Sequence, residues 1–389
     1  MTRNLSGLPA AARDLLWGTN WGSLQHAYGS GEDIPVALCS LVDEDPEVRS
    51  EALAVLDTGL LHQGSLYTAT VPAALFVAAI LNHPVGLTDH EGHPPWDDGR
   101  PRTLRAALLV WMGQVAESAA YGEDLVRDRT DWQWAPWHDE TRREPDPDKL
   151  TALHACREVR PTLYDAIEPF LNSPDPHVRE AALGAAVPLL SAPELADRLP
   201  RAATLLRTRL GTVAGRRERA SVARALGVWR MDTSDLLDDS DPAVRVCAAL
   251  SPAHVDRPRA LAILLDALRD PRTTDGWFPE PLPGLDGWFR FTVLRSALVL
   301  AETFEEVAPV AIAIAAAGGT SVVDFERGPI LRRAFPGGYD PAHPLTPAQR
   351  DLLRAFVHTD EATGSIGGNV LWFRAAGLPD NREGLAALL

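Results

Sequence analysis

The sequence has few cysteines, no long apolar run and no lead-in segment typical of secreted proteins. Its 389 residues include only Cys39, Cys156 and Cys247, with no Cys-x-x-Cys pair, which argues against a disulfide framework or a cysteine-bound metal. The most apolar stretch, 307–317, is too short to cross a bilayer, and no early apolar run precedes a cleavage site. We therefore expect buried free thiols, no membrane association and a cytoplasmic location.

Motifs of common enzyme families are also missing. The chain has no GxSxG, no P-loop, no dinucleotide fingerprint on a strand and no helical HExxH. His90 and His93 could supply two metal ligands, but their loop offers no further motif, so we predict no metal and no cofactor. His62, in the turn His62-Gln63-Gly64-Ser65, lacks an evident nucleophile to activate, and we favour a hydrogen-bonding role for it. We favour a protein that is not an enzyme, and its catalytic residues, if any exist, are unknown.

Lysine is almost absent, because Lys149 is the only one among 37 basic residues. Acidic residues number 53, and the formal net charge of −16 should repel nucleic-acid phosphates and favour partners with a basic surface. One segment departs from this balance by its high density of arginine. The candidate anion-binding residues in it are Arg207, Arg209, Arg216, Arg217, Arg219 and Arg224. A solvated arginine-rich helix pair, balanced by acidic neighbours, is the alternative interpretation.

The strongest positive feature is one pattern that occurs three times. It reads Asp-Pro-x-Val-Arg at 45–49, 175–179 and 241–245, and each copy runs on into an alanine-rich apolar segment. Asp before Pro starts a helix, because the Asp side chain caps the first amides and Pro at the first helical position loses no hydrogen bond. The Arg lies one position beyond the apolar stripe, where its head can reach carbonyls or acids of the adjoining unit.

The spacing of these copies indicates a repeat protein. Asp175 and Asp241 are 66 residues apart, and a glycine-containing turn between them suggests two units of about 33 residues each. Asp270-Pro271 has the form of a fourth copy whose second helix is postponed by a loop. At this point the chain resembles the HEAT-repeat proteins. The resemblance implies an all-α fold, a right-handed α-solenoid of stacked antiparallel helix pairs with N- and C-terminal capping regions.

A closer resemblance is carried by segments near the two ends. They are His62-Gln63-Gly64-Ser65-Leu66-Tyr67-Thr68-Ala69-Thr70, Thr346-Pro347-Ala348-Gln349-Arg350, Gly368-Asn369-Val370-Leu371-Trp372-Phe373-Arg374 and Gly377-Leu378-Pro379. These segments are similar to those of bacterial, actinomycete-type HEAT-repeat proteins, a group of largely unassigned function. The resemblance covers most of the chain and says little about chemistry.

The helical periodicity predicts a chain of paired helices between two caps. The expected helices are 33–42 with 46–58, 70–82 with 102–117, 161–172 with 176–190, 193–209 with 216–229, 233–238 with 242–250, and 257–269 with 289–303. The predicted organisation is an N-terminal cap over 1–32, a solenoid over 33–303, and degenerate repeats with a cap over 304–389.

Three insertions interrupt this pattern, at about 83–100, 122–148 and 271–287. Long loops of repeat proteins tend to collect on one face and bind partners, and tryptophan is enriched where binding energy concentrates. The partner-binding candidates in and beside these loops are Trp132, Trp134, Trp137, Trp277 and Trp288. The alternative is that these rings fold back and fill gaps between helices.

The sequence leaves two hypotheses of function. The first is a scaffold, monomeric, whose superhelical groove binds a protein or peptide, as an immunity or regulatory protein would. The second rests on the arginine segment and the tryptophans, which resemble features of the HEAT-like DNA glycosylases that act on alkylated bases. We favour the first, because the acidic balance disfavours nucleic acid and no catalytic residues of those enzymes can be matched here.

Overall fold

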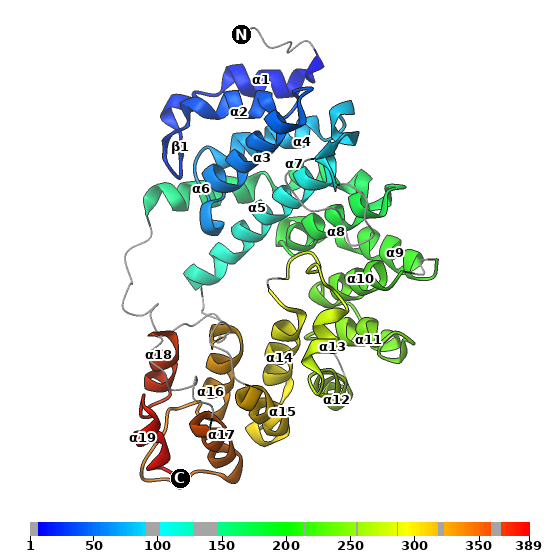
Figure 1. Cartoon of the computed structure of the whole chain (residues 1–389). Helices are drawn as coiled ribbons and strands as arrows, with labels where there is room; N and C mark the ends of the chain where they lie inside the picture. Colours follow the sequence, from blue (N-terminus) through cyan, green and yellow to red (C-terminus); the bar gives the residue numbers. More distant parts are fainter. Residues whose placement is uncertain are drawn as a thin grey trace. The chain divides into compact units, whose positions relative to one another are not determined.

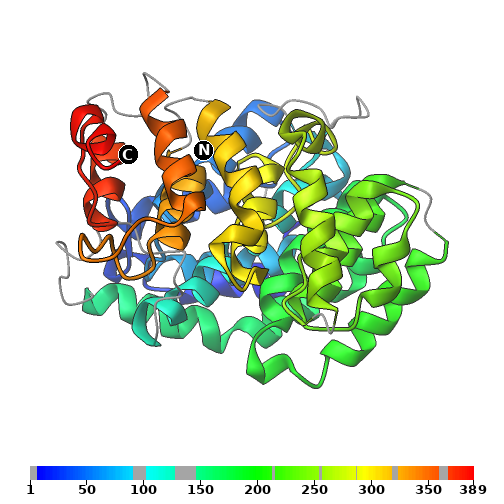
Figure 2. The same ribbon diagram turned by 90° about the horizontal axis from the view of Figure 1, so that it is seen from below.

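The computed structural model describes residues 7–90, 102–127, 146–212, 215–253, 256–285, 287–317, 323–358 and 367–389. Nearly all regular structure in these ranges is helical, which confirms the all-α class. The chain forms two compact units. Unit 1 holds the described residues up to 231 together with 282–284, and unit 2 holds 232–281 and the described residues from 285 onward. Figure 1 labels the elements, and Figure 2 gives a second view of them.

Unit 1 begins with a helix and a short hairpin and continues as a series of helices. Its α-helices are α1 (Ala10–Gly18), α2 (Ile34–Ser40), α3 (Pro46–Leu60), α4 (Thr70–Ile80), α5 (Leu104–Arg127), α6 (Pro147–Glu158), α7 (Arg160–Ile167), α8 (Pro176–Leu190), α9 (Leu199–Leu210) and α10 (Arg216–Val228). Antiparallel pairs of two-residue strands are β1 (Gln25–His26) with β2 (Gly29–Ser30), and β3 (Asp89–His90) with β4 (Arg102–Thr103). Short 3-10 turns link several of the helices, including η7 (Glu168–Asn172) before α8.

The regular structure among the described residues of unit 2 is all helical. Its helices are η9 (Ser234–Asp238), α11 (Pro242–Ala249), α12 (Arg257–Ala267), α13 (Pro271–Gly276), α14 (Phe289–Leu300), α15 (Phe304–Ala317), η10 (Val323–Arg327), α16 (Gly328–Ala334), α17 (Pro347–His358), α18 (Gly367–Ala375) and α19 (Arg382–Ala386). Among the packed pairs are α11 with α12, α12 with α14 and α15 with α17, and these neighbours lie side by side in both views (Figures 1 and 2).

Most predicted helices are present with shifted ends, and three regions differ from the prediction. Helix α5 runs to Arg127, beyond the expected end at 117. Helix α6 begins at Pro147, inside the expected insertion 122–148, and it was not predicted. Helix α13 occupies 271–276, the first part of the expected insertion 271–287. Both helices start at an Asp-Pro pair, so the same capping chemistry produces them, and the start of α13 agrees with the predicted fourth copy at Asp270-Pro271.

Close approach of helices depends on small residues at particular crossings. In unit 1, α5 packs along α8, where a Cβ on Gly113 would lie 3.0 Å from the Cα atom of Ala185. In unit 2, Gly328 lies beneath the Trp372 ring, and an added Cβ would come within 2.2 Å of it. Side chains larger than glycine are therefore excluded at both crossings unless the helices move apart. No described helix has the length and apolar character needed to cross a membrane.

Candidate functional site

The three repeated turns share one hydrogen-bonding scheme at the start of α3, α8 and α11. In each turn the Asp side chain accepts a bond from the amide two residues later and so caps the helix. The pairs are Asp45 with the amide of Glu47 at 3.0 Å, Asp175 with His177 at 2.9 Å, and Asp241 with Ala243 at 3.0 Å. These bonds confirm the predicted caps, and each satisfies an amide that the helix leaves unpaired.

The arginine of each turn closes the turn from the other side. Its Nη1 atom donates to the two carbonyls that lie six and five residues earlier. Arg49 bonds the carbonyls of Asp43 and Glu44, Arg179 those of Ser173 and Pro174, and Arg245 those of Asp239 and Ser240, at 2.7–3.2 Å. The prediction that these heads reach carbonyls is confirmed, although the carbonyls belong to the arginine's own turn.

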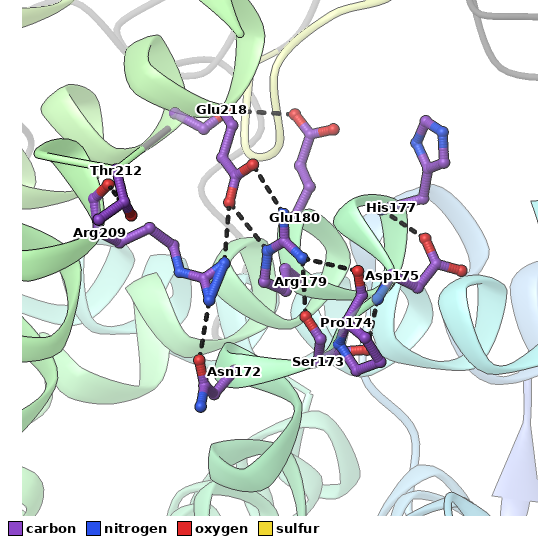
Figure 3. Close-up of polar contacts among 11 residues, drawn as sticks. Asn172, Ser173, Pro174, Asp175, His177, Arg179, Glu180, Arg209, Thr212 and Glu218 are labelled. Atoms are coloured by element: carbon purple, nitrogen blue, oxygen red, sulfur yellow. Dashed lines mark hydrogen bonds and ion pairs between the residues drawn. The ribbon is translucent and has the colours of Figure 1, made fainter. Parts of the chain in front are cut away.

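The remaining edge of the guanidinium is used differently in each copy. In Arg179, Nε and Nη2 each bond one carboxylate oxygen of Glu218 on α10, both at 2.8 Å (Figure 3). In Arg49, Nη2 bonds the carbonyl of Asp89 at 3.1 Å. The hydrogen bonds of Arg245 within the described chain go to its own two carbonyls, and its side chain lines a groove of unit 2.

The six arginines predicted to bind anions lie on α9 and α10 of unit 1, and the structure surrounds several of them with partners. Arg209 contacts Glu218 at 3.4 Å and the side-chain oxygen of Asn172 at 2.8 Å (Figure 3). Arg217 bonds Glu180 at 2.8 Å. Arg224 bonds the carbonyls of Pro283 and Gly284 at 2.7 and 2.6 Å, while Arg207, Arg216 and Arg219 have interactions of their own.

Two acids therefore hold two of these six arginines in place, Arg209 through Glu218 and Arg217 through Glu180. The carboxylates of Glu180 and Glu218 are 7% and 19% exposed, and they lie on neighbouring helices α8 and α10. Ser221 adds a hydroxyl bond of 3.1 Å to Glu180. Ion pairs with this little exposure fix the register of two helices and leave less charge for an outside anion.

A groove in unit 2 is a candidate binding site. It has a volume of about 490 Å³ and is bounded by residues of α11, α12 and α13. It is lined by Trp277, by apolar residues of α12 (Ala262, Ile263 and Ala267) and by polar groups. The charged residues that line it are Arg245, Arg259, Arg269, Asp266 and Asp270. An aromatic wall beside arginines and hydroxyls is suited to holding a ligand that is partly apolar and partly charged.

Trp277 and Trp288 are the two predicted partner-binding tryptophans within the described residues, and they have different surroundings. Trp277 is half-buried against Phe289, with ring centroids 6.3 Å apart, and its other side lines the groove. Trp288 is 57% exposed and stacks on Phe291 at 6.2 Å. The other three candidates, Trp132, Trp134 and Trp137, lie outside the described residues.

The stack around Trp288 forms a second surface feature of unit 2. Phe291 lies parallel to Phe325 on its other side, 5.0 Å between centroids, and Phe325 is 47% exposed. Beneath the Trp288 ring, the Arg290 guanidinium lies 3.8 Å from the ring centroid and pairs with Asp275 and Glu326. Burial raises the pKa of Glu326, against the opposing effect of the bond from Arg290.

The cysteines and His62, which the sequence analysis considered, have structural surroundings. Cys156 and Cys247 are buried free thiols, as predicted, and Cys39 is half-buried. Burial raises the pKa of the Cys156 thiol to about 12, which keeps it protonated and unreactive. The His62 ring lies 3.4 Å from the Tyr28 hydroxyl. Among described residues, no group of three metal-binding side chains comes together, and His93 lies outside them.

No known protein family, curated protein or solved structure was found to match this chain.

Proposed function

We propose that this protein is a binding scaffold built as a right-handed solenoid of HEAT-type helix pairs, and that the groove of unit 2 receives a segment of a partner protein or a peptide. The observation that carries the proposal is the groove itself, where Trp277 faces an open space lined by three arginines. Tryptophan and arginine are the residues in which binding energy most often concentrates at interfaces.

The repeated turns support the repeat architecture. The same cap and the same arginine closure start α3, α8 and α11, so three helices far apart in the chain are begun by one local design. Some consecutive helices pack against each other, among them α2 with α3 and α11 with α12. A protein of this kind presents its binding residues from several short helices at once, as α11, α12 and α13 do here.

Charge supports a protein partner over nucleic acid. The net charge of −16 opposes DNA, and Glu218 and Glu180 pair with Arg209 and Arg217 of the arginine cluster on α9 and α10. This acidic net charge agrees with a monomeric cytoplasmic scaffold whose partner has a basic surface. A DNA glycosylase would instead need a cationic surface that is free to contact DNA.

The experiment is site-specific photocrosslinking in the native host. A benzophenone amino acid replaces exposed Ala262, which lines the groove on α12, and in a matched control it replaces Val299, 66% exposed on α14. We expect a discrete protein adduct from position 262 and none of the same mass from position 299. Equal labelling at the two positions, or no adduct at 262, would refute the proposed function. A nuclease-sensitive adduct would instead favour the DNA-glycosylase alternative.

A further inference from the structure

Arg245 differs from its counterpart Arg179 in the partners of Nε and Nη2, which form the outer edge of the guanidinium. Both arginines follow an Asp-Pro cap by the same number of residues. In both, Nη1 donates hydrogen bonds to the two carbonyls of the arginine's own turn. In Arg179 the other two nitrogens grip both oxygens of one carboxylate, at 2.8 Å each. In Arg245 the corresponding nitrogens have no described carboxylate within ion-pair distance, and the half-buried side chain faces the groove.

The side chains that accompany the two arginines also differ. Glu218, which pairs with Arg179, is the third residue of α10. The third residue of α13, the next helix after α11 to start at an Asp-Pro pair, is Thr273. Thr273 lines the groove together with Arg245. Arg179 thus meets the carboxylate of Glu218, whereas the groove that Arg245 lines contains the hydroxyl of Thr273, which donates to Asp270.

The other cations of the groove have acids of their own. Arg259 pairs with Asp238, and Arg269 pairs with Asp266 at 3.2 Å. Among the three arginines that line the groove, Arg245 is thus the one whose charge no described carboxylate balances. Asp266 and Asp270 also line the groove, and their negative charge disfavours a doubly charged phosphate more than a single carboxylate.

We infer that the outer edge of Arg245 binds a carboxylate of a peptide segment in this groove, with an apolar side chain of the same segment against Trp277. The inference rests on the proposed function and names the chemistry of the partner's segment. Planar guanidinium and carboxylate groups fit each other through two parallel hydrogen bonds, as Arg179 and Glu218 do within this protein. A partner with a basic surface overall would present one acidic side chain, or its own C-terminal carboxylate, at this point.

The test uses the full chain and a displayed library of random dodecapeptides. Peptides that bind are resynthesised with each Glu or Asp changed to the amide, or with an amidated C-terminus, and measured by fluorescence polarisation. We expect one such change to weaken binding about tenfold or more, the effect of losing a charge-assisted pair. Acetate should compete with the parent peptide more effectively than inorganic phosphate at equal concentration.

Protein variants locate the effect. Thr273→Glu adds an internal carboxylate to the groove that Arg245 lines. It should weaken binding about tenfold relative to Thr273→Gln, which is of similar size without the charge. Arg245→Gln should weaken binding similarly, whereas Arg272→Gln, the same charge change at an exposed residue that does not line the groove, should not. Thermal melting of each variant shows whether it is folded, and Thr273→Glu keeps Arg245 and its turn intact if Arg245→Gln is unstable.

The outcomes separate the two proposals. Peptides without a required carboxylate, stronger competition by phosphate, or equal binding by Thr273→Glu and Thr273→Gln would overturn the role of Arg245 and leave a groove-specific crosslink from position 262 standing. A library that yields no binder would also overturn the inference. If position 262 gives no specific crosslink, the proposed function is refuted, and the inference about Arg245 is refuted with it.

Discussion

The coupling between Arg179 and Glu218 is the interaction in this protein whose strength is most directly open to measurement. Two bonds of 2.8 Å join the groups, and the side chains are 13% and 19% exposed. Charge-assisted hydrogen bonds contribute about 1.5–3 kcal/mol each when buried, and partial solvent access lowers that figure. We expect a coupling free energy of about 2 kcal/mol for the pair.

The structure predicts which of the two single variants lowers the free energy of unfolding more. Glu218→Gln removes the carboxylate and should lower the free energy of unfolding by about 2 kcal/mol. Arg179→Gln should lower it further, by about 3 kcal/mol, because the carbonyls of Ser173 and Pro174 also lose their donor. The double variant should be less destabilised than the sum of the two by the coupling free energy.

The assay is a double-mutant cycle in urea, followed by circular dichroism, with hydrogen exchange of α8 and α10 peptides as the local readout. A matched control in the same unit is the pair of Arg198 and Asp165, 3.2 Å apart but 39% and 59% exposed. Its coupling should be below about 0.5 kcal/mol. If the two cycles give the same small coupling, the claim that Glu218 stabilises the fold through its pair with Arg179 is refuted.

Three further predictions concern buried groups of unit 1. Val178→Asp places a charge at a position that is 3% exposed and should lower the free energy of unfolding by about 3 kcal/mol or more; melting at the wild-type temperature would contradict its packing. Burial raises the pKa of Tyr164 to about 12, above the ordinary 10.0 of the unfolded chain, so stability is full below about pH 10 and falls as pH rises toward 12. Tyr164→Phe should flatten that fall in urea titrations, and an unchanged slope would count against the assignment. At pH 8 about one Cys156 thiol in ten thousand is ionised, so iodoacetamide should label Cys39 first and Cys156 only on unfolding, as peptide mass spectrometry would show.

The helix starts could be predicted because their chemistry is local. A cap such as Asp175, the proline after it and the carbonyls that Arg179 closes all lie within seven residues, so the sequence displays the whole unit. The same signal stood at Asp146-Pro147, where α6 begins, and it was missed because the surrounding Pro- and Asp-rich composition indicated an insertion. A search for Asp-Pro pairs alone would have found that helix.

The partners of the arginine cluster could not be predicted in the same way. Arg217 and Glu180 are 37 residues apart, and Arg179 and Glu218 are 39 apart. Local spacing does not show these two pairs, because each joins an arginine and an acid on helices that are far apart in the chain. The density of arginine alone therefore predicts an anion site, and only the packing of α8 against α10 reveals the ion pairs.

The groove was partly visible and partly hidden in the sequence. Trp277 was singled out as an unusual aromatic, and the structure places it on the wall of the groove. Its companions come from helices that start at 242, 257 and 271, and no sequence period brings those residues together. Burial of one side of the indole against Phe289 likewise depends on a contact across a loop.

In each repeated arginine, Nη1 bonds the turn while the other two nitrogens are left for different partners, and this separation has an evolutionary consequence. One nitrogen of Arg49, Arg179 and Arg245 secures the start of its own helix, so selection on folding keeps the residue in place whatever its other edge does. The opposite edge is then available for change, and in these three copies it has come to hold a backbone carbonyl, a carboxylate, or no described group. New specificity can arise by exchanging one facing side chain, without rebuilding the helix that presents the arginine.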